Sequence, residues 1–366
     1  MASFGTGYKQ TLYFGNETHY GSAAVIDTAP GLVQSVTPTE TNNLIKVRTM
    51  GGTRDYANIV PGKFEVSGSF DYLLQTGDFL RFAFGEESGT TATTDAGPKI
   101  HTGASYRHCM GSYAPLGVNS FPSFTLEFND FENTAATADP ANANLKRMFT
   151  GCRVNNLSIA GTVDEPVKVS CDWIAQGVTV STAASATVTA PTVDPFVFYQ
   201  GWVYATSGAI TGNTSIASTS RLAQVNSFDF SINNNLEPTW YISGTTSTLE
   251  TLRGLKGLIP KGRDYDGNLK LHFKNRDMYR RFLGSATANS SQGTLTDYYV
   301  VIDFARIGSP TSTPKTITDN WMRLVMKSKF DTNAISGSPE DIVSQDLGLA
   351  ISRAVCYFVD ATTRYN

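Results

Sequence analysis

The sequence predicts a mainly β protein with short helices, built as two related β-sandwiches or half-open β-barrels in tandem, each flanked by one helix. Three observations lead to this expectation. A 26-residue segment recurs without a gap 199 residues later, and short stretches of alternating apolar and polar residues occur throughout. The third is length, because a chain of 366 residues exceeds the size at which one hydrophobic core usually suffices.

The repeated segment reads VPGKFEVSGSFDYLLQTGDFLRFAFG at 60–85 and IPKGRDYDGNLKLHFKNRDMYRRFLG at 259–284. The matched positions are Pro61, Gly68, Asp78, Arg81 and Gly85 in the first copy, and Pro260, Gly267, Asp277, Arg280 and Gly284 in the second. Because the offset stays constant along the segment, we interpret the repeat as duplication of a whole structural unit.

The first half of each copy reads as a strand. Val66, Phe70 and Tyr72 share one parity, so they predict one apolar face. Gly68 interrupts that face, and a glycine inside a strand favours a bulge, a bend or a close approach of neighbouring groups. Its counterpart Gly267 predicts the same feature in the second copy.

The second half of each copy reads as a short helix. Asp78 lies where a carboxylate can accept hydrogen bonds from the first backbone N–H groups, and Gly85 lies where the chain needs a left-handed cap. Phe79, Phe82 and Phe84 supply an apolar stripe. The second copy keeps this pattern except that Arg281 replaces an apolar residue at the position of Phe82.

Composition changes along the chain predict three regions. Residues 1–43 are polar and interrupted by proline, which favours an extended N-terminal arm with little to bury. Strand patterns then predict a first β domain over 44–190 and a second over 191–366. The low-complexity run at 177–195 is interpreted as the end of a strand plus the connection between them.

Charge and hydropathy exclude some classes of partner. Charged residues make up 17% of the chain, below the roughly 25% of average soluble proteins, and the net charge is only -3. This balance gives no general argument for binding nucleic acid or an anionic membrane. Apolar runs are short and the N-terminus lacks a signal-peptide pattern, so neither membrane insertion nor secretion is expected.

The segment from 253 to 281 is locally basic. It contains the candidate electrostatic contact residues Arg253, Lys256, Lys261, Arg263, Lys270 and Lys274. Such a cluster can meet an acidic surface on a neighbouring subunit or a polyanion, or it can be a solvated loop and helix face. The sequence leaves these alternatives open.

No pattern of residues predicts catalysis, a cofactor or a metal site. His108 and Cys109 are adjacent on an expected strand, so their side chains point to opposite faces and are poorly placed to ligate one metal. The cysteines are scattered and are expected to be reduced thiols. Cys152 and Cys171 flank a predicted hairpin, either as cross-strand neighbours or as two small apolar side chains in a core. We therefore expect no enzyme activity.

Three segments in a fixed order carry a family resemblance. They are VSGSFDYLLQTGDFLRFAFG at 66–85, FTGCRVNNLSIAGTVDEPVKVSCDWIAQG at 149–177 and VNSFDFSINNNLEP at 225–238. Together with the repeat, they resemble the tail-tube (major tail) proteins of tailed bacteriophages, over most of the chain from about Asn43 onward.

The resemblance implies tube domains that are β-sandwiches flanked by a helix. It also implies sixfold rings that stack into a hollow tube, in which the inner sheets join into a β-barrel around the channel that conducts DNA out of the capsid. If each chain holds two such domains, three chains complete a ring, so a homotrimer with pseudo-sixfold symmetry is expected, with a homohexamer as the alternative.

The same resemblance implies partners and a location. The expected partners are further copies of the chain, the tape-measure, tail-tip and tail-terminator proteins, and DNA in transient non-specific passage. The expected location is the virion tail, after synthesis and assembly in the host cytoplasm. The arm at 1–43 and the loop at 86–120 are expected to reach the adjacent ring, and the basic segment is expected at a ring-to-ring or outer surface.

A different function remains open at this stage. Two β-sandwiches also suit another virion or cell-surface protein, such as a capsid decoration, an adhesin or a carbohydrate-binding module. A sugar-binding module predicts monomers with exposed aromatic platforms, whereas a tube subunit predicts self-assembly.

Overall fold

The computed structural model describes residues 10–50, 54–85, 99–100, 106–111, 121–131, 144–181, 188, 191–210, 216–222, 224–241, 253–305, 321–339 and 341–360. In chain order the strands are β1 (Thr11–Asn16), β2 (Leu32–Thr41), β3 (Ile45–Val47), β4 (Asn58–Val60), β5 (Glu65–Leu73), β6 (Lys99–Ile100), β7 (Tyr106–Met110), β8 (Phe124–Phe131), β9 (Asn144–Thr162), β10 (Lys168–Ala175), β11 (Gly177–Ser181), β12 (Gly201–Thr206), β13 (Val225–Asn233), β14 (Leu236–Thr239), β15 (Gly257–Pro260), β16 (Asp264–His272), β17 (Tyr298–Ala305), β18 (Trp321–Ser336) and β19 (Ser344–Asp360). The helices are α1 (Arg81–Phe84), which continues the 3₁₀ turn η2 (Asp78–Leu80), and α3 (Asp277–Leu283), with further 3₁₀ turns η3 (Phe198–Gln200) and η4 (Ser218–Ser220). The mainly β fold class is confirmed.

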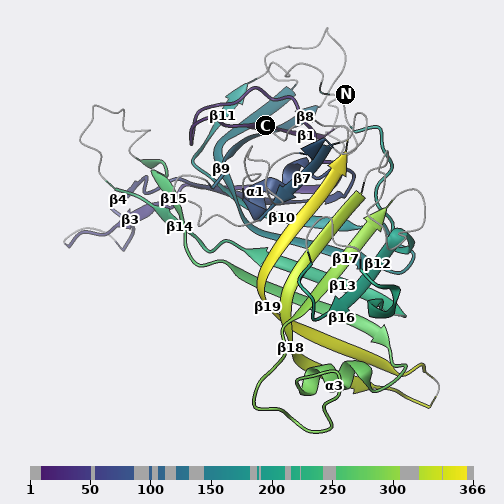
Figure 1. The fold of residues 1–366 in the computed structure, drawn as a ribbon. Coiled ribbons are helices and arrows are strands. Elements are labelled where there is room, and N and C mark those ends of the chain that lie inside the picture. Colours follow the sequence, from purple (N-terminus) through teal and green to yellow (C-terminus); the bar gives the residue numbers. More distant parts are fainter. Residues whose placement is uncertain are drawn as a thin grey trace.

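One long antiparallel sheet organises the molecule (Figure 1). Its central strands follow the order β18, β19, β16, β13, β9, β10, β5, β2. β9 also belongs to a second set of paired strands, because its first half pairs with β8 and β11 while its second half pairs with β10 and β13. Such long strands, bent between two sets of partners, give the sandwich its two faces.

The strand pairings occur twice along the chain. In what we call the first unit, β1 pairs with β8, β8 with β9, β9 with β10 and β11, β10 with β5, β5 with β2, and β3 with β4. In the second unit, β12 pairs with β17, β17 with β18, β18 with β19, β19 with β16, β16 with β13, and β14 with β15. β16 begins and ends 199 residues after β5, and α3 occupies the place of η2 and α1 at the same offset.

The alternation of apolar and polar residues along the strands explains which side chains form the core. Val66, Phe70 and Tyr72 are buried, as their shared parity predicts. Phe79 and Phe82 are also fully buried, and Phe79 meets Phe70 edge to face with ring centroids 5.1 Å apart. The core continues from one unit into the other, because Phe84 stacks on Phe230 at 5.8 Å.

The two helices end as the sequence predicts but begin differently. Gly85 and Gly284 follow them with φ of 106° and 133°, a region that only glycine enters at low cost. The N-cap residues are Gly77 and Arg276, and neither caps through its side chain. Asp78 lies inside the first turn rather than at the N-cap, and there the positive end of the helix dipole favours its negative charge.

The described part of the expected N-terminal arm is built into the first unit. β1 pairs with β8 and contributes the buried side chains Leu12 and Phe14, while β2 pairs with β5 along its length. Residues 10–43 therefore do not form a free arm. The apolar alternation of β1 is only a few residues long, which is why the sequence did not indicate this pairing. The bounds of the arm and of the two domains stay a prediction. Residues 1–9 lie outside the described residues.

The loop expected at 86–120 lies largely outside the described residues. Its described strand β7 pairs with the second half of β19, so a segment from the first half of the chain extends the sheet of the second unit. Within the described residues, no helix has both the length and the apolar content to cross a membrane.

Candidate self-association surface

The two units meet at a continuous backbone joint. β13 of the second unit pairs with the second half of β9 of the first, with Phe230 opposite Ile159 and Ile232 opposite Leu157. All four side chains are fully buried. The joint therefore combines a hydrogen-bonded ladder with a closed apolar face, the combination that specifies register in a sheet.

The central sheet has two edges that are open among the described residues. β2 pairs with β5 alone, and residues 329–336 of β18 pair with β19 alone. An edge strand presents unpaired N–H and C=O groups that can template pairing with another chain.

These open edges are the counterparts of the joined ones. Ser35 of β2 pairs with Asp71, and Ser227 of β13 pairs with Lys270, which lies 199 residues after Asp71, so β2 corresponds to β13 at an offset of 192. When the pairs are followed in the same way from β5 through β10, and from β16 through β19, β9 corresponds to β18 at an offset of 176 residues. Even the β-bulges fall at matching places in both pairs of strands.

Burial differs at the counterpart positions. Ile159, inside the joint, has no exposed surface, whereas its counterpart Ile335 on the open edge of β18 is 45% exposed. On the other edge, Phe228 of β13 is buried while its counterpart Val36 of β2 is only partly buried. Apolar side chains thus lie on the open edges in the positions that the joint covers.

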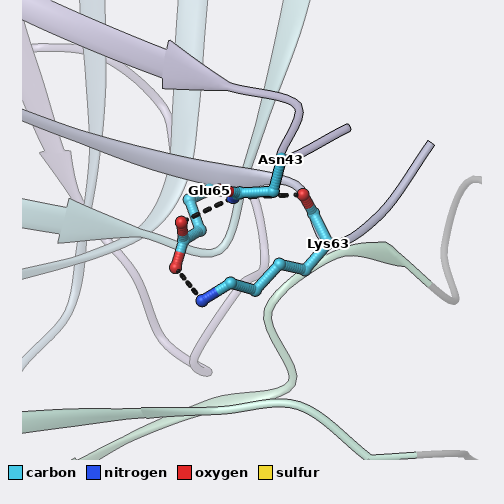
Figure 2. A network of polar contacts seen from close by, with 3 residues as sticks. All are labelled: Asn43, Lys63 and Glu65. Atoms are coloured by element: carbon cyan, nitrogen blue, oxygen red, sulfur yellow. Dashed lines mark hydrogen bonds and ion pairs between the residues drawn. The ribbon is translucent and has the colours of Figure 1, made fainter. Parts of the chain in front are cut away.

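Two hairpins project side by side from the same side of the molecule, β3 with β4 and β14 with β15 (Figure 1). At the base of the first, the Asn43 side chain lies between Lys63 and Glu65 (Figure 2). Asn43 Nδ2 donates to Glu65 Oε2 at 2.6 Å and to the Lys63 carbonyl at 3.3 Å, and Lys63 Nζ donates to Glu65 Oε1 at 2.6 Å. The network fixes where the hairpin leaves the sheet.

The second hairpin repeats the asparagine part of this network, without the ion pair, because Gly262 stands at the position of Lys63. Asn235 Nδ2 donates to the Gly262 carbonyl and to Asp264 Oδ2, both at 2.7 Å. Asn43 and Asn235 both have positive φ, 42° and 47°, which asparagine tolerates better than most residues. The shared backbone conformation and shared partners show that both hairpins leave their sheets by one design.

The charge of Glu65 takes part in the first network. The hydrogen bond from Lys63 is the largest influence and lowers the pKa of the Glu65 carboxyl from its ordinary value, with Asn43 acting in the same direction. Because the side chains of Lys63 and Glu65 are both partly exposed, water screens their ion pair, and the network serves geometry more than stability.

The face of the central sheet that points away from the core is polar. On β5, β10, β13, β16 and the first half of β19, its acidic residues are Glu65, Asp71, Asp172, Asp229, Asp264, Asp266 and Asp346, and its lysines are Lys168 and Lys270. Lys168 forms an ion pair with Asp71 at 3.0 Å. Burial raises the pKa of Asp229, and the nearby Asp266 raises it further. This face carries excess negative charge.

The candidate contact residues of the basic segment do not form one patch. Arg263 donates to Asn234 Oδ1 and to the Phe84 carbonyl, both at 2.9 Å, so it binds structure inside the chain. Lys261 pairs with Glu237 at 2.7 Å on the second hairpin. Lys256 is half-buried, Lys274 is exposed beside α3, and Lys270 lies on the polar sheet face. Contacts between rings stay a prediction for these residues.

Arg253 connects the two hairpins. Its Nε donates to the Gly62 carbonyl at 2.7 Å, its guanidinium donates to Asn42 Oδ1 at 2.8 Å, and its carbonyl accepts from the Phe64 N–H at 3.0 Å. This arginine therefore attaches the second hairpin to the base of the first.

The residues matched by the repeat serve local structure. Pro61 follows β4 and Pro260 ends β15, so both lie at the bases of the hairpins. Arg81 is buried with its Nε 3.8 Å from Asp78 Oδ1, whereas Arg280 donates to Asn289 Oδ1 at 3.0 Å and Asp277 accepts from the Asn275 side chain at 2.8 Å. The repeat therefore preserves positions more closely than contacts.

The cysteines are buried and free. The register places Cys171 opposite Leu157, so the cross-strand pairing of Cys152 with Cys171 is wrong. Burial raises the pKa of both thiols. Among the described residues no group of three or more His, Cys, Asp and Glu side chains could hold a metal ion.

Sequence reasoning missed the hairpin-base asparagines and the arginine link. Asn43 and Asn235 lie 192 rather than 199 residues apart, because more residues separate β14 from β15 than separate β3 from β4. Arg54 and Arg253, by contrast, share the offset of 199 and could have been found by extending the alignment toward the N-terminus.

Comparison with known proteins relates the chain to a family. The model of a family described as phage tail tube protein matches residues 7–350. No curated protein matches the chain.

Proposed function

Because the chain belongs to the phage tail tube protein family, we propose that it self-assembles into stacked rings that form the hollow tube of the phage tail, and that this tube conducts DNA during ejection. The observation that carries the proposal is the β13 to β9 joint, whose two strands have open counterparts at the opposite ends of the central sheet. The role is structural and requires no catalysis.

Ring closure repeats the joint between chains. β2 of one copy pairs antiparallel with residues 329–336 of β18 of the next copy, just as β13 pairs with β9 within the chain. The internal register then places Pro38 opposite Ile335 and Thr39 opposite Ala334, because Phe230 faces Ile159 and Ser231 faces Ser158. Pro38 lacks an N–H group, which costs this edge one donor and does not block the rest of the ladder.

Three copies close the ring. Each chain supplies two units joined in the way that one chain joins the next, so a homotrimer has pseudo-sixfold symmetry. In this reading the chain holds two tube domains, the first including residues 10–43, with a core shared across the boundary. A pair of complementary but different edges is a heterologous contact, and such contacts close into rings when the rotation permits.

The polar sheet face lines the channel in this arrangement. Its acidic excess keeps phosphates from binding, because each lysine or arginine in contact with a phosphate adds salt-sensitive affinity. DNA then passes without being held. The tube meets the tape-measure protein inside and the tail-tip and tail-terminator proteins at its ends, in the virion tail and after assembly in the host cytoplasm.

The test is the mass of the assembled particle together with its image. Purified chain, concentrated and examined by electron microscopy and light scattering, should give hollow rings with the mass of three chains, and stacks of such rings. Rings of six chains would reject the role assigned to the duplication. A species that stays monomeric would reject the tube.

A single substitution makes the test specific to the joint. Ile335→Asp places a charge on the open edge of β18, where the side chain is 45% exposed, so the isolated chain should fold as before while ring formation is lost. Val180→Asp is the matched control, because Val180 is 64% exposed on β11 and takes no part in the joint. Rings formed equally well by both variants would contradict the proposed pairing.

A further inference from the structure

The hairpin of β3 and β4 exposes apolar side chains whose counterparts are buried. Leu44, Tyr56 and Ile59 are 57%, 43% and 51% exposed, whereas Leu236, Leu255 and Leu258 are 8%, 3% and 3% exposed. Ile59 and Leu258, like Tyr56 and Leu255, are 199 residues apart, and Leu44 and Leu236 are 192 apart as in the neighbouring strands. The two hairpins are built alike, but other parts of the chain cover only the apolar side chains of the second.

The first unit provides the cover for the second hairpin. Leu236, Leu255 and Leu258 form one cluster with Phe121, and Tyr20 and Ile174 pack against it. Arg153 Nη1 donates to the Leu258 carbonyl at 2.5 Å and lies over the Tyr20 ring at 4.5 Å. The contact therefore joins an apolar patch to one hydrogen bond from a cation on β9.

The arginine that attaches the second hairpin to the first unit also has a counterpart on the first hairpin. Arg253 binds the Gly62 carbonyl and Asn42 of the first unit. Its counterpart Arg54 is exposed on the first hairpin. An apolar patch and an arginine thus lie on the first hairpin in the arrangement that the second hairpin uses for docking.

We infer that the β3 and β4 hairpin docks on the second unit of the neighbouring copy of this chain, through Leu44, Tyr56, Ile59 and Arg54. This inference rests on the proposed ring, because the copy that receives the hairpin is the one whose β18 edge pairs with β2. In that copy Lys329 takes the place of Arg153, at the offset of 176 that relates β9 to β18. Leu295, 42% exposed and three residues before β17, takes the place of Phe121, three residues before β8.

Cross-linking between two different chains tests the contact directly. Ile59→Cys and Lys329→Cys are made in separate preparations, mixed, assembled and treated with a short bismaleimide. The cysteines of the chain itself are buried and add little background. A covalent dimer should appear in the mixture and in neither preparation alone, and mixing Val180→Cys with Lys329→Cys should give none.

The outcomes separate this inference from the ring. Three-chain rings without the dimer would overturn the hairpin contact and leave the ring intact, whereas the absence of assembly would overturn both. As a second measurement, Leu44→Ser with Ile59→Ser should raise at least tenfold the concentration at which half of the chains are in rings. Val25→Ser, at an exposed position on neither hairpin, should leave it unchanged. An unchanged concentration for the double variant would also overturn the contact.

Discussion

Gly68 and Gly267 occupy the same place in the two units but differ in the space around them. A Cβ at Gly68 would lie 2.5 Å from Trp173 Cζ2 and 2.8 Å from the Thr37 carbonyl oxygen. A Cβ at Gly267 would lie 2.9 Å from Ile351 Cδ1, the end of a flexible side chain. Both glycines therefore allow neighbouring groups to approach the strand backbone closely, and the neighbours are closer in the first unit.

This difference predicts unequal effects of one substitution. Gly68→Ala should lower the free energy of unfolding by about 1–3 kcal/mol, the usual cost of overpacking, because an indole ring and a backbone carbonyl cannot both move aside. Gly267→Ala should cost less. Urea unfolding of both variants measures the two changes, and equal costs would show that Trp173 does not set the limit at Gly68.

The Glu65 carboxyl predicts a pH dependence at the base of the first hairpin. Its pKa is lower in the folded chain than its ordinary value of 4.5, so the contribution to stability is complete above 4.5 and is lost as the pH falls through the folded pKa. The melting temperature of the chain should exceed that of Glu65→Gln at pH 7, and this difference should close in acid. A difference that is constant with pH would exclude the charge as its cause.

At the scale of the element, the two hairpins show how a backbone conformation and a side chain cooperate. Asn43 and Asn235 supply both a tolerated positive φ and an amide that binds the start of the next sheet strand. A hairpin of three-residue strands has too few ladder bonds to set its own direction. The amide network sets it instead.

Substitution at Asn43 separates the two contributions. Asn43→Gly keeps the positive φ and loses the hydrogen bonds, at a cost of about 0.5–1.5 kcal/mol. Asn43→Ala loses both and should cost about 1 kcal/mol more, because alanine is strained at positive φ. Hydrogen exchange of β3 and β4 measures the loosening. If the alanine and glycine variants were equally stable, the positive φ at residue 43 would not limit which residue this position accepts.

At the scale of the whole molecule, one sheet face is closed by the core and the other remains polar. The acidic excess of the polar face predicts that assembled tubes release DNA at physiological salt. Asp266→Lys reverses one charge in each copy and should give DNA binding that weakens as salt increases. Asp194→Lys, on the connection between β11 and β12, is the control. Filter binding measures both, and equal retention by the two variants would place the polar face away from the channel.

The shared core limits how far the two units can be separated. Phe84 of the first unit stacks on Phe230 of the second, and the Phe196 N–H of the second unit donates to the Leu74 carbonyl of the first at 2.9 Å, so contacts cross between the units. The repeat predicts two similar folds and says nothing about the surface between them. Stacking of rings stays a prediction, and the basic residues of the second unit remain its candidates.

The sequence alone determined the repeat, the mainly β class, the positions of the two helices and the glycines that end them. These features follow from local periodicity and backbone preference, which a short window of residues contains. The buried faces of β5, β10 and the helix at 78–84 follow in the same way, since alternation and the aromatic stripe define them.

Only the tertiary structure decided which edges are joined and which are open. Ile159 and Ile335 are the same residue type at corresponding positions, yet one is buried and the other exposed, because only β9 has the second unit beside it. The pairing of residues 10–43 with β8 and β5, and the hydrogen bonds of Arg253 to the first unit, were also decided by the tertiary structure. Burial at an edge depends on the partner strand, and no periodicity within a strand encodes what lies next to it.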